Sequence, residues 1–116
     1  MIESDKLDTI VNEVSERVQE ILSDKLKKII LYGSYARGDY EQYSDIDIMV
    51  LADIREDDED ERMDIRNKMV RISSDLGLEY DVLISIIVKN HDFFYSWIDV
   101  LPFYRNVLKD GVLLYG

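Results

Sequence analysis

The chain has 116 residues, 47% of them hydrophobic, and its 25 acidic and 14 basic side chains give a formal net charge of -11. This length suits one domain with its own hydrophobic core, and the negative charge would repel a phosphate backbone, which argues against direct nucleic-acid binding. Because the chain has no cysteine and no apolar run near the ~20 residues of a membrane span, we expect no disulfide bond, thiolate metal site or membrane helix.

We therefore predict a single domain over residues 1–116. Its first residues, Met1–Asp5, are acidic and lack the basic and then apolar layout of a signal peptide. The expected protein is soluble and cytoplasmic, without a membrane association.

The first predicted element is an amphipathic helix. Between Leu7 and Leu22, apolar residues recur at steps of three and four, and charged residues fill the gaps. Ser4 is a suitable N-cap, so this helix is expected from about Ser4 to about Ser23. After a short basic turn, the apolar run Ile29–Tyr32 predicts a short, buried, internal strand.

The middle of the chain alternates loops with regular elements. Residues 34–37 can form one helical turn, a polar stretch then predicts a loop, and residues 45–51 predict a second strand. The acidic run 56–61 is most simply a solvated segment leading into a helix, although it could instead dock a basic partner. This helix is expected to stop at Gly77.

The last third of the chain begins with a long strand, predicted over Tyr80–Val88, which has apolar residues on both faces. Aromatic residues follow at helical spacing, which predicts one or two core-facing helices broken near Pro102. Gly111 is expected to end the last helix, and Val112–Tyr115 to return as a short strand or packed tail. The lone histidine, His91, is interpreted as a loop or helix-start residue rather than a general base.

Two aspartates interrupt the apolar second strand. Side chains two positions apart in a strand share a face, so Asp45 and Asp47 are expected to project together while Ile46 and Ile48 point into the core. Unpaired, the carboxylates would repel each other, whereas a divalent cation between them removes that cost and gains hard oxygen ligands, with Mg²⁺ as the natural candidate. Asp81, early in the third predicted strand, would add a third carboxylate if that strand lies beside the second.

Gly33 and Ser34 stand where the first strand ends and a helical turn begins. Free backbone amides and a serine hydroxyl at such a point can hold a phosphate, and glycine lets the phosphate approach the backbone. Phosphate donors opposite metal-binding carboxylates describe a site for a nucleoside triphosphate. Arg37 could clamp a phosphate or contact a partner, and it could equally brace its loop by pairing with Asp39 or Glu41.

The combined pattern resembles the nucleotidyltransferase superfamily that includes DNA polymerase beta. The resemblance rests on Gly33-Ser34, on Asp45-Ile46-Asp47 eleven residues after the serine, and on a later strand aspartate. The string Gly-Ser-Tyr-Ala-Arg-Gly at 33–38 and the closing segment 104–115 resemble more narrowly the minimal nucleotidyltransferases (MNT). The resemblance covers nearly the whole chain.

This resemblance implies an α+β domain with the nucleotidyltransferase fold, a small mixed β-sheet with helices packed mainly on one face. Superfamily members use two magnesium ions on three carboxylates to transfer a nucleotide from a triphosphate to an acceptor hydroxyl. Carried to this chain, Asp45, Asp47 and Asp81 would be the catalytic metal ligands, and Asp81 would also help the acceptor hydroxyl lose its proton. Gly33 and Ser34 would hold the triphosphate.

The same resemblance implies a protein partner. MNT proteins are commonly encoded beside a small helical HEPN protein, often an RNA-cleaving toxin, and act as its antitoxin by placing AMP from ATP on a toxin tyrosine. The sequence shows no additional domain of the kind that binds tRNA or an antibiotic, which favours a protein acceptor. Two alternatives stay open: a non-catalytic antitoxin that binds a basic partner through its acidic surface, and nucleotidyl transfer to a small molecule such as an aminoglycoside. No motif identifies the preferred base.

Overall fold

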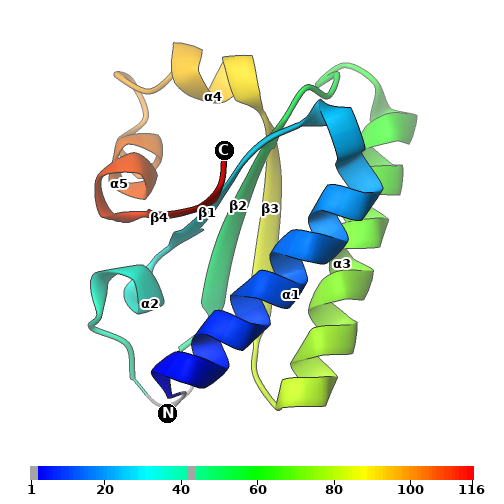
Figure 1. Cartoon of the computed structure of the whole chain (residues 1–116). Coiled ribbons are helices and arrows are strands. Elements are labelled where there is room, and N and C mark those ends of the chain that lie inside the picture. Colours follow the sequence, from blue (N-terminus) through cyan, green and yellow to red (C-terminus); the bar gives the residue numbers. More distant parts are fainter. Residues whose placement is uncertain (1–2, 42–43) are drawn as a thin grey trace.

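The computed structural model describes residues 3–41 and 44–116. The elements in chain order are α1 (Ser4–Leu22), the 3₁₀ turn η1 (Ser23–Lys25), β1 (Leu26–Tyr32), α2 (Ser34–Arg37), β2 (Ile46–Ala52), α3 (Glu59–Tyr80), β3 (Ile84–Asn90), α4 (His91–Ser96), α5 (Pro102–Asp110) and β4 (Val112–Tyr115). The strands form one sheet in the order β3-β2-β1-β4, in which β1 is antiparallel to both β2 and β4, and β2 is parallel to β3 (Figure 1). This architecture confirms the predicted α+β class and the small mixed sheet.

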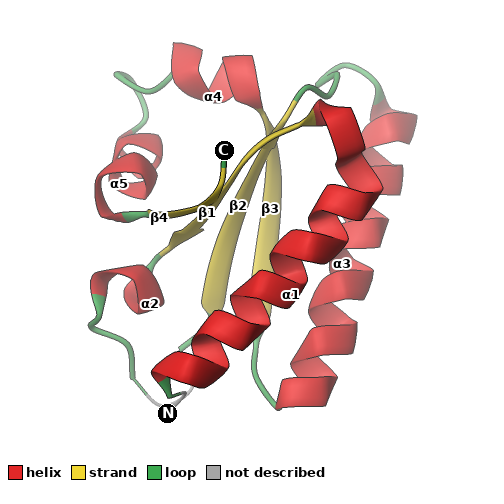
Figure 2. Cartoon of the chain, in the orientation of Figure 1, coloured by secondary structure: helices red, strands yellow, loops and turns green. Residues whose placement is uncertain are grey.

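Helices cover both faces of this sheet. The two long helices, α1 and α3, lie side by side on one face, and the shorter α4 and α5 lie on the other (Figure 2). The larger core lies under α1 and α3 and includes fully buried Val14, Val18 and Ile72, while the smaller one surrounds Phe94 and Met49. Burial of each such side chain contributes about 1.5–3 kcal/mol to folding. Most of the helical packing is thus on one face, as predicted.

α1 forms where the apolar periodicity predicts it. Its buried residues Ile10, Val14 and Val18 recur at four-residue steps, and the helix ends before Ser23, whose φ of 50° turns the chain toward β1. β1 begins earlier than expected, at Leu26, because the basic stretch taken for a turn is part of the strand. Lys27 is exposed there, as the alternation of a strand allows.

The end of α3 differs from the prediction. The helix continues past Gly77 to Tyr80, and the left-handed residue that ends it is Asp81, at φ 55° and ψ 52°. Gly77 has a different purpose, since a Cβ there would lie 2.9 Å from the carbonyl oxygen of Val82 on the returning chain. The predicted strand over 80–88 is therefore wrong at its start, and β3 begins only at residue 84.

β3 lies at the edge of the sheet, so all of its residues are half-buried and the predicted burial on both sides is wrong. The N–H of Ile46 donates to the carbonyl of Leu83, so the odd-numbered residues here direct their N–H and C=O groups toward β2. Because these directions alternate along a strand, the even-numbered residues of β3 direct theirs to the open edge of the sheet. At the end of the strand, Glu56 Oε1 closes this edge by accepting the N–H of Asn90 at 3.0 Å. The acidic run also starts α3, because the side chain of Asp58 caps the helix.

The last quarter of the chain follows the prediction in outline. Pro102 is the first residue of α5, Gly111 is its C-cap, and β4 pairs with β1.

In the described part of the chain, no helix combines the length and the apolar character that crossing a membrane requires.

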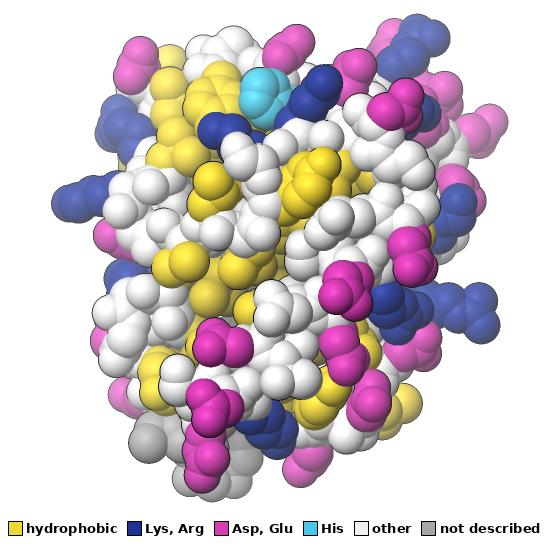
Figure 3. Space-filling view, viewed as in Figure 1, with side chains coloured by type: hydrophobic (Ala, Val, Ile, Leu, Met, Phe, Trp, Pro, Cys, Tyr) yellow, Lys and Arg dark blue, Asp and Glu magenta, His cyan; other side chains and the backbone are white. Residues whose placement is uncertain are grey.

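The aromatic residues of this quarter are divided between core and surface. Phe94 and Tyr104 are buried, with ring centroids 4.6 Å apart, as the helical spacing predicts. Phe93, Trp97 and Phe103 are instead 39%, 42% and 43% exposed. Figure 3 shows hydrophobic side chains at the surface over α4, at the upper left of the view. The core position that helical spacing predicts is therefore wrong for Phe93, Trp97 and Phe103.

Candidate functional site

Asp45 and Asp47 lie where β2 begins. The strand starts at Ile46, so Asp47 is within it and Asp45 directly precedes it. Ile46 and Ile48 are fully buried in the core under α1 and α3, whereas Asp47 is half-buried and Asp45 is exposed. The alternation predicted from the sequence is confirmed, and the core accommodates the two charges because they lie on the opposite face of the strand.

Gly33 brings the end of β1 against Asp47. Tyr32 is the register partner of Asp47, and Gly33 follows it with φ 78° and ψ -157°, a conformation essentially restricted to glycine. A Cβ at position 33 would also overlap Oδ2 of Asp47. The position therefore requires glycine for two reasons, and as a result the first turn of α2 begins beside the carboxylate.

These residues form one wall of an open cleft of about 580 Å³. The volume is within the usual range for a small-molecule site. Four of the six predicted site residues share this cleft, which fits the proposed combination of phosphate-binding and metal-binding groups. The wall consists of Tyr32, Gly33, Ser34, Arg37 and Asp47.

The opposite wall is formed by α5, which the sequence prediction did not include. Phe103, Asn106, Val107 and Asp110 line the cleft from this helix. Their spacing of three, four and seven residues marks one helix face, and Val107 anchors that face in the smaller core. The sequence did contain a signal for this wall: Asn106 and Asp110 are polar residues on the helix face that Val107 packs against the sheet.

Burial and charge repulsion both disfavour the ionised form of Asp47. Removal from water raises the pKa of this carboxyl, the charge of Asp45 raises it further, and the guanidinium of Arg37 partly offsets the shift. Burial and the charge of Asp47 also raise the pKa of the Tyr32 phenol to about 12. This end of the cleft therefore has an excess of negative charge that a bound cation would relieve.

Asp45 and Asp47 fit a divalent cation by the chemistry of their donor atoms. Carboxylate oxygens are the hard ligands that Mg²⁺ prefers, and the raised pKa of Asp47 is the behaviour expected of a carboxyl without a full counter-charge. These two residues could hold a magnesium ion at the edge of the cleft.

Asp81 is not grouped with them. It is the exposed C-cap of α3 rather than a strand residue, and the β3 residue in register with Asp47 is Ser85. Among residues 3–41 and 44–116, no three acidic or histidine side chains come together as a metal-binding group. The predicted position of Asp81, in a strand beside Asp47, is wrong because α3 extends three residues beyond Gly77.

Arg37 combines two of its predicted alternatives. Its Nε donates to Asp39 Oδ2 at 3.2 Å and so braces the loop, while the residue also lines the cleft. Because both partners of this ion pair are exposed, the pair is weak and leaves Arg37 available to an anion. His91 is the first residue of α4, with Nδ1 3.0 Å from Asp92 Oδ1, which confirms its interpretation as a helix-start residue.

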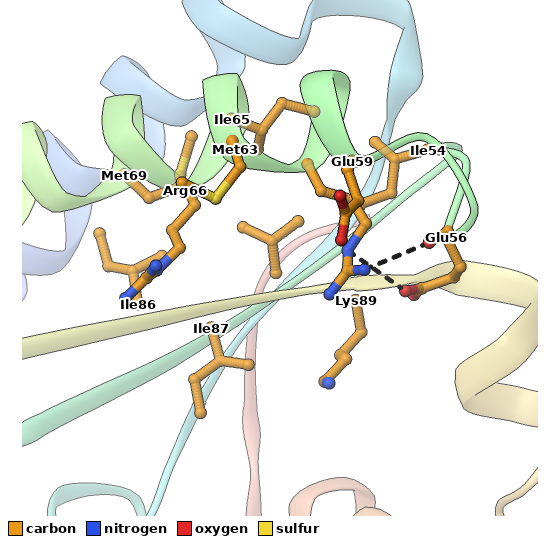
Figure 4. A pocket seen from close by; sticks show the side chains of 12 residues that line it. Ile54, Glu56, Glu59, Met63, Ile65, Arg66, Met69, Ile86, Ile87 and Lys89 are labelled. Atoms are coloured by element: carbon orange, nitrogen blue, oxygen red, sulfur yellow. Dashed lines mark hydrogen bonds and ion pairs between the residues drawn. The ribbon is translucent and has the colours of Figure 1, made fainter.

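A second hollow, of about 520 Å³, lies between α3 and the open edge of β3 (Figure 4). Its lining combines apolar residues such as Met63 and Ile86 with charges of both signs. Its Glu56 is already engaged, by Arg62 at 3.9 Å and by a backbone N–H of β3. Glu56 and Glu59 both line this hollow, but the cations Arg62, Arg66 and Lys89 line it beside them. The excess of negative charge and the glycine turn at Gly33 are features of the cleft, which is therefore the candidate functional site.

Comparison with known proteins identifies the family of the chain. The model of the family described as "Nucleotidyltransferase domain" matches residues 8–114. The chain belongs to this nucleotidyltransferase family. In Methanocaldococcus jannaschii, "Putative protein adenylyltransferase MJ0141" is 38% identical over 95 residues, which are 82% of this chain and 91% of that protein. "Putative protein adenylyltransferase MJ0604" is 43% identical over 91 residues, or 78% and 80% of the two chains.

Solved structures agree with this assignment. A protein described as a "putative nucleotidyltransferase" from Sulfolobus solfataricus is 26% identical, with a TM-score of 0.60 over 92% of this chain and 78% of that one. The structure of a tri-AMPylated Shewanella oneidensis HEPN toxin in complex with MNT antitoxin gives a TM-score of 0.53 at 20% identity, over 94% of this chain and 71% of that one. These similarities confirm the nucleotidyltransferase fold, and the family match confirms that the chain is a nucleotidyltransferase enzyme.

Proposed function

We propose that this nucleotidyltransferase is a Mg²⁺-dependent protein adenylyltransferase that places AMP from ATP on a tyrosine of a small helical HEPN-type toxin, and so acts as its antitoxin. The observation that carries the proposal is the cleft in which the Asp47 carboxylate lies against Gly33, with Ser34 and Arg37 on the same wall. The relatives named as protein adenylyltransferases support the activity, and the complex of an AMPylated HEPN toxin with an MNT antitoxin supports the acceptor.

In the proposed reaction, the phenolic oxygen of the acceptor attacks the α-phosphorus of ATP. The bond from that phosphorus to the oxygen bridging to the β-phosphate breaks, pyrophosphate leaves, and the phenol releases its proton. Gly33 and Ser34 hold the triphosphate, and Arg37 offsets its negative charge. Asp45 and Asp47 hold magnesium, which when bound neutralises phosphate charge and orients the phosphates.

Asp81 lies at the C-cap of α3 and, in the described part of the chain, is not grouped with Asp45 and Asp47. Its proposed role, to ligate a second ion near the acceptor and take the phenolic proton, requires the end of α3 to approach β2. Asp81→Asn tests this role directly: a large loss of transfer with unchanged ATP binding is the expected result if Asp81 acts on the acceptor side.

The surface beside the cleft favours a protein acceptor over a small cationic one. Phe103 lines the cleft and is 43% exposed, and Trp97 and Val100, earlier in the same segment, are 42% and 60% exposed. Apolar patches with aromatic residues are typical of protein interfaces, whereas an aminoglycoside would be attracted by carboxylates alone.

The test combines the purified protein with labelled ATP, Mg²⁺ and the HEPN-type protein encoded beside it. We expect label on a tyrosine of that protein, and loss of label when Asp45 and Asp47 are both replaced by asparagine. Asp53→Asn, at an exposed acidic position after β2, is the matched control. If the double variant still neutralises the toxin, the protein is a binding antitoxin, and absence of label with folded wild-type protein contradicts the proposal.

A further inference from the structure

The face of α5 in the cleft presents three unlike chemical groups. Phe103, Asn106 and Asp110 supply an aromatic ring, a carboxamide and a carboxylate, and all three line the cleft. Asn106 is exposed and Asp110 is half-exposed, so their polar groups are open to a ligand. Val107, 2% exposed, fixes the same helix face against the sheet.

An aromatic pair connects this face to the metal-binding wall. The ring of Tyr32 lies 5.7 Å from that of Phe103, and Tyr32 is the register partner of Asp47. Phe103 keeps 43% of its surface exposed in a cleft that also carries the charged residues Arg37, Asp47 and Asp110. An exposed ring at such a position fits a ligand with a flat apolar part as well as an anionic part.

A nucleoside triphosphate has this composition. Its phosphates match Ser34 and Arg37, and a cation held by Asp47 would bind them as well. On the facing wall, the aromatic ring matches the base, the carboxylate matches the ribose, and the carboxamide matches the polar edge of the base. Bases stack on aromatic rings whatever their identity, so Phe103 would add affinity without selecting a base. The ribose hydroxyls can donate hydrogen bonds to a carboxylate such as that of Asp110.

Asn106 can select the base. A carboxamide offers one donor and one acceptor side by side, which pair with the N7 acceptor and the N6 amino donor of adenine. Guanine presents two acceptors, N7 and O6, on that edge, so a single asparagine side chain cannot make the same two bonds.

We propose that this face of α5, residues Phe103, Asn106 and Asp110, is the nucleoside-binding part of the site, and that Asn106 makes it selective for adenine. The inference rests on the proposed use of ATP and adds the residues that would recognise its adenosine part, which no sequence motif identified. It also gives α5 a role beyond packing.

The experiment measures displacement of a fluorescent ATP analogue by ATP, GTP, CTP, UTP and inorganic tripolyphosphate, with Mg²⁺ present. Wild-type protein is expected to prefer ATP by roughly tenfold or more. Asn106→Ala should lose the preference, and Asn106→Asp should lose it as well, because a carboxylate has no donor for the N7 acceptor of adenine. Asn67→Asp, on the exposed surface of α3, is the matched control and should behave as wild type.

Phe103→Leu separates stacking from base selection. It should weaken all four nucleotides by a similar factor and leave tripolyphosphate unaffected, because only the nucleoside contacts the ring. An ATP preference that survives in both Asn106 variants, or equal binding of the four nucleotides by wild type, overturns the inference and leaves the proposed transfer standing. If wild type binds no nucleoside triphosphate, the proposed function itself is contradicted.

Discussion

Gly33 lies directly against the carboxylate of Asp47, so that a methyl group at position 33 would overlap Oδ2. Gly33 directly follows β1, and Asp47 lies in the neighbouring antiparallel strand β2, so the two residues meet at the junction of the phosphate-binding and carboxylate parts of the cleft. The backbone of Gly33, at φ 78° and ψ -157°, adds a conformational reason for the glycine.

Gly33→Ala should therefore lower both stability and transfer. The strained backbone costs about 1–3 kcal/mol of unfolding free energy, and displacement of Asp47 should reduce transfer by about 100-fold. The matched variant is Gly38→Ala, because Gly38 also has a positive φ, 85°, but no atom of the described residues lies within 4 Å of the new Cβ. It should lose about 1 kcal/mol and keep its activity. Urea unfolding and a transfer assay on both variants check the pair, and an active Gly33→Ala enzyme would refute it.

Asp47→Asn should abolish transfer while raising stability at neutral pH. Because burial and Asp45 raise the pKa of Asp47 in the folded protein, the unfolded chain ionises first as pH rises. The stability associated with this carboxyl is thus complete below its unfolded pKa and is lost as pH rises through the folded one. When the free energy of unfolding is measured from acidic to neutral pH, the value for Asp47→Asn should rise relative to that of wild type over this interval.

Magnesium should make wild type more stable than Asp47→Asn at neutral pH, the reverse of the order expected without it. A ligand that binds only the folded protein raises the midpoint of unfolding, so MgCl₂ should stabilise wild type and have little effect on Asp47→Asn. Thermal melts with and without MgCl₂ provide the measurement, with CaCl₂ and NaCl as ionic controls. Equal stabilisation of both proteins by MgCl₂ would place the ion elsewhere.

The hydrogen bond from Tyr80 to Glu13 should make the contact between α3 and α1 sensitive to alkaline pH. The bond is 2.6 Å long, and the carboxylate raises the pKa of the phenol to about 12. The contribution of Tyr80 to stability is therefore complete below pH 10 and is lost as pH rises toward 12. The difference in unfolding free energy between wild type and Tyr80→Phe should shrink over this interval.

Replacement of Asn90 should lower the unfolding free energy more than replacement of most other polar residues. Its Oδ1 caps α4 by accepting the N–H of Phe93 at 2.8 Å, and its Nδ2 donates to the carbonyl of Ile54. Asn90→Ala removes both bonds and should lower the unfolding free energy by roughly 2–3 kcal/mol. Asn67→Ala, on the exposed side of α3, should change it by about 0.5 kcal/mol or less. Chemical denaturation of the two variants measures the difference.

The periodicity of the hydrophobic residues and the short motifs predicted most of the helices and strands. They also predicted one of the two walls of the cleft. The alternation around Asp47 is visible in four consecutive residues, and Gly33 stands at a strand end that the apolar run defines, so both were predictable from local chemistry. The family resemblance then supplied the roles that spacing alone could not.

The boundary between α3 and β3 was not predictable in the same way. Gly77 is followed by an apolar residue, which is typical of a helix end, but here the glycine makes room for Val82 on the returning chain. The bond between Tyr80 and Glu13 then holds an extra turn that only the packed structure can reveal. Asp81 was misplaced for this tertiary reason, and the wall formed by α5 was missed because it depends on which helix face meets the cleft.

The pairing of β1 with β2 also determines when the site can assemble during folding. Gly33 and Asp47 are joined by a short stretch of chain, so their approach closes a small loop at low entropic cost. The contacts of α5 with β1 and within the smaller core join residues that are distant in sequence, so forming them closes larger loops. We therefore expect the phosphate and carboxylate groups to be in place early in folding, and the wall formed by α5 to arrive last.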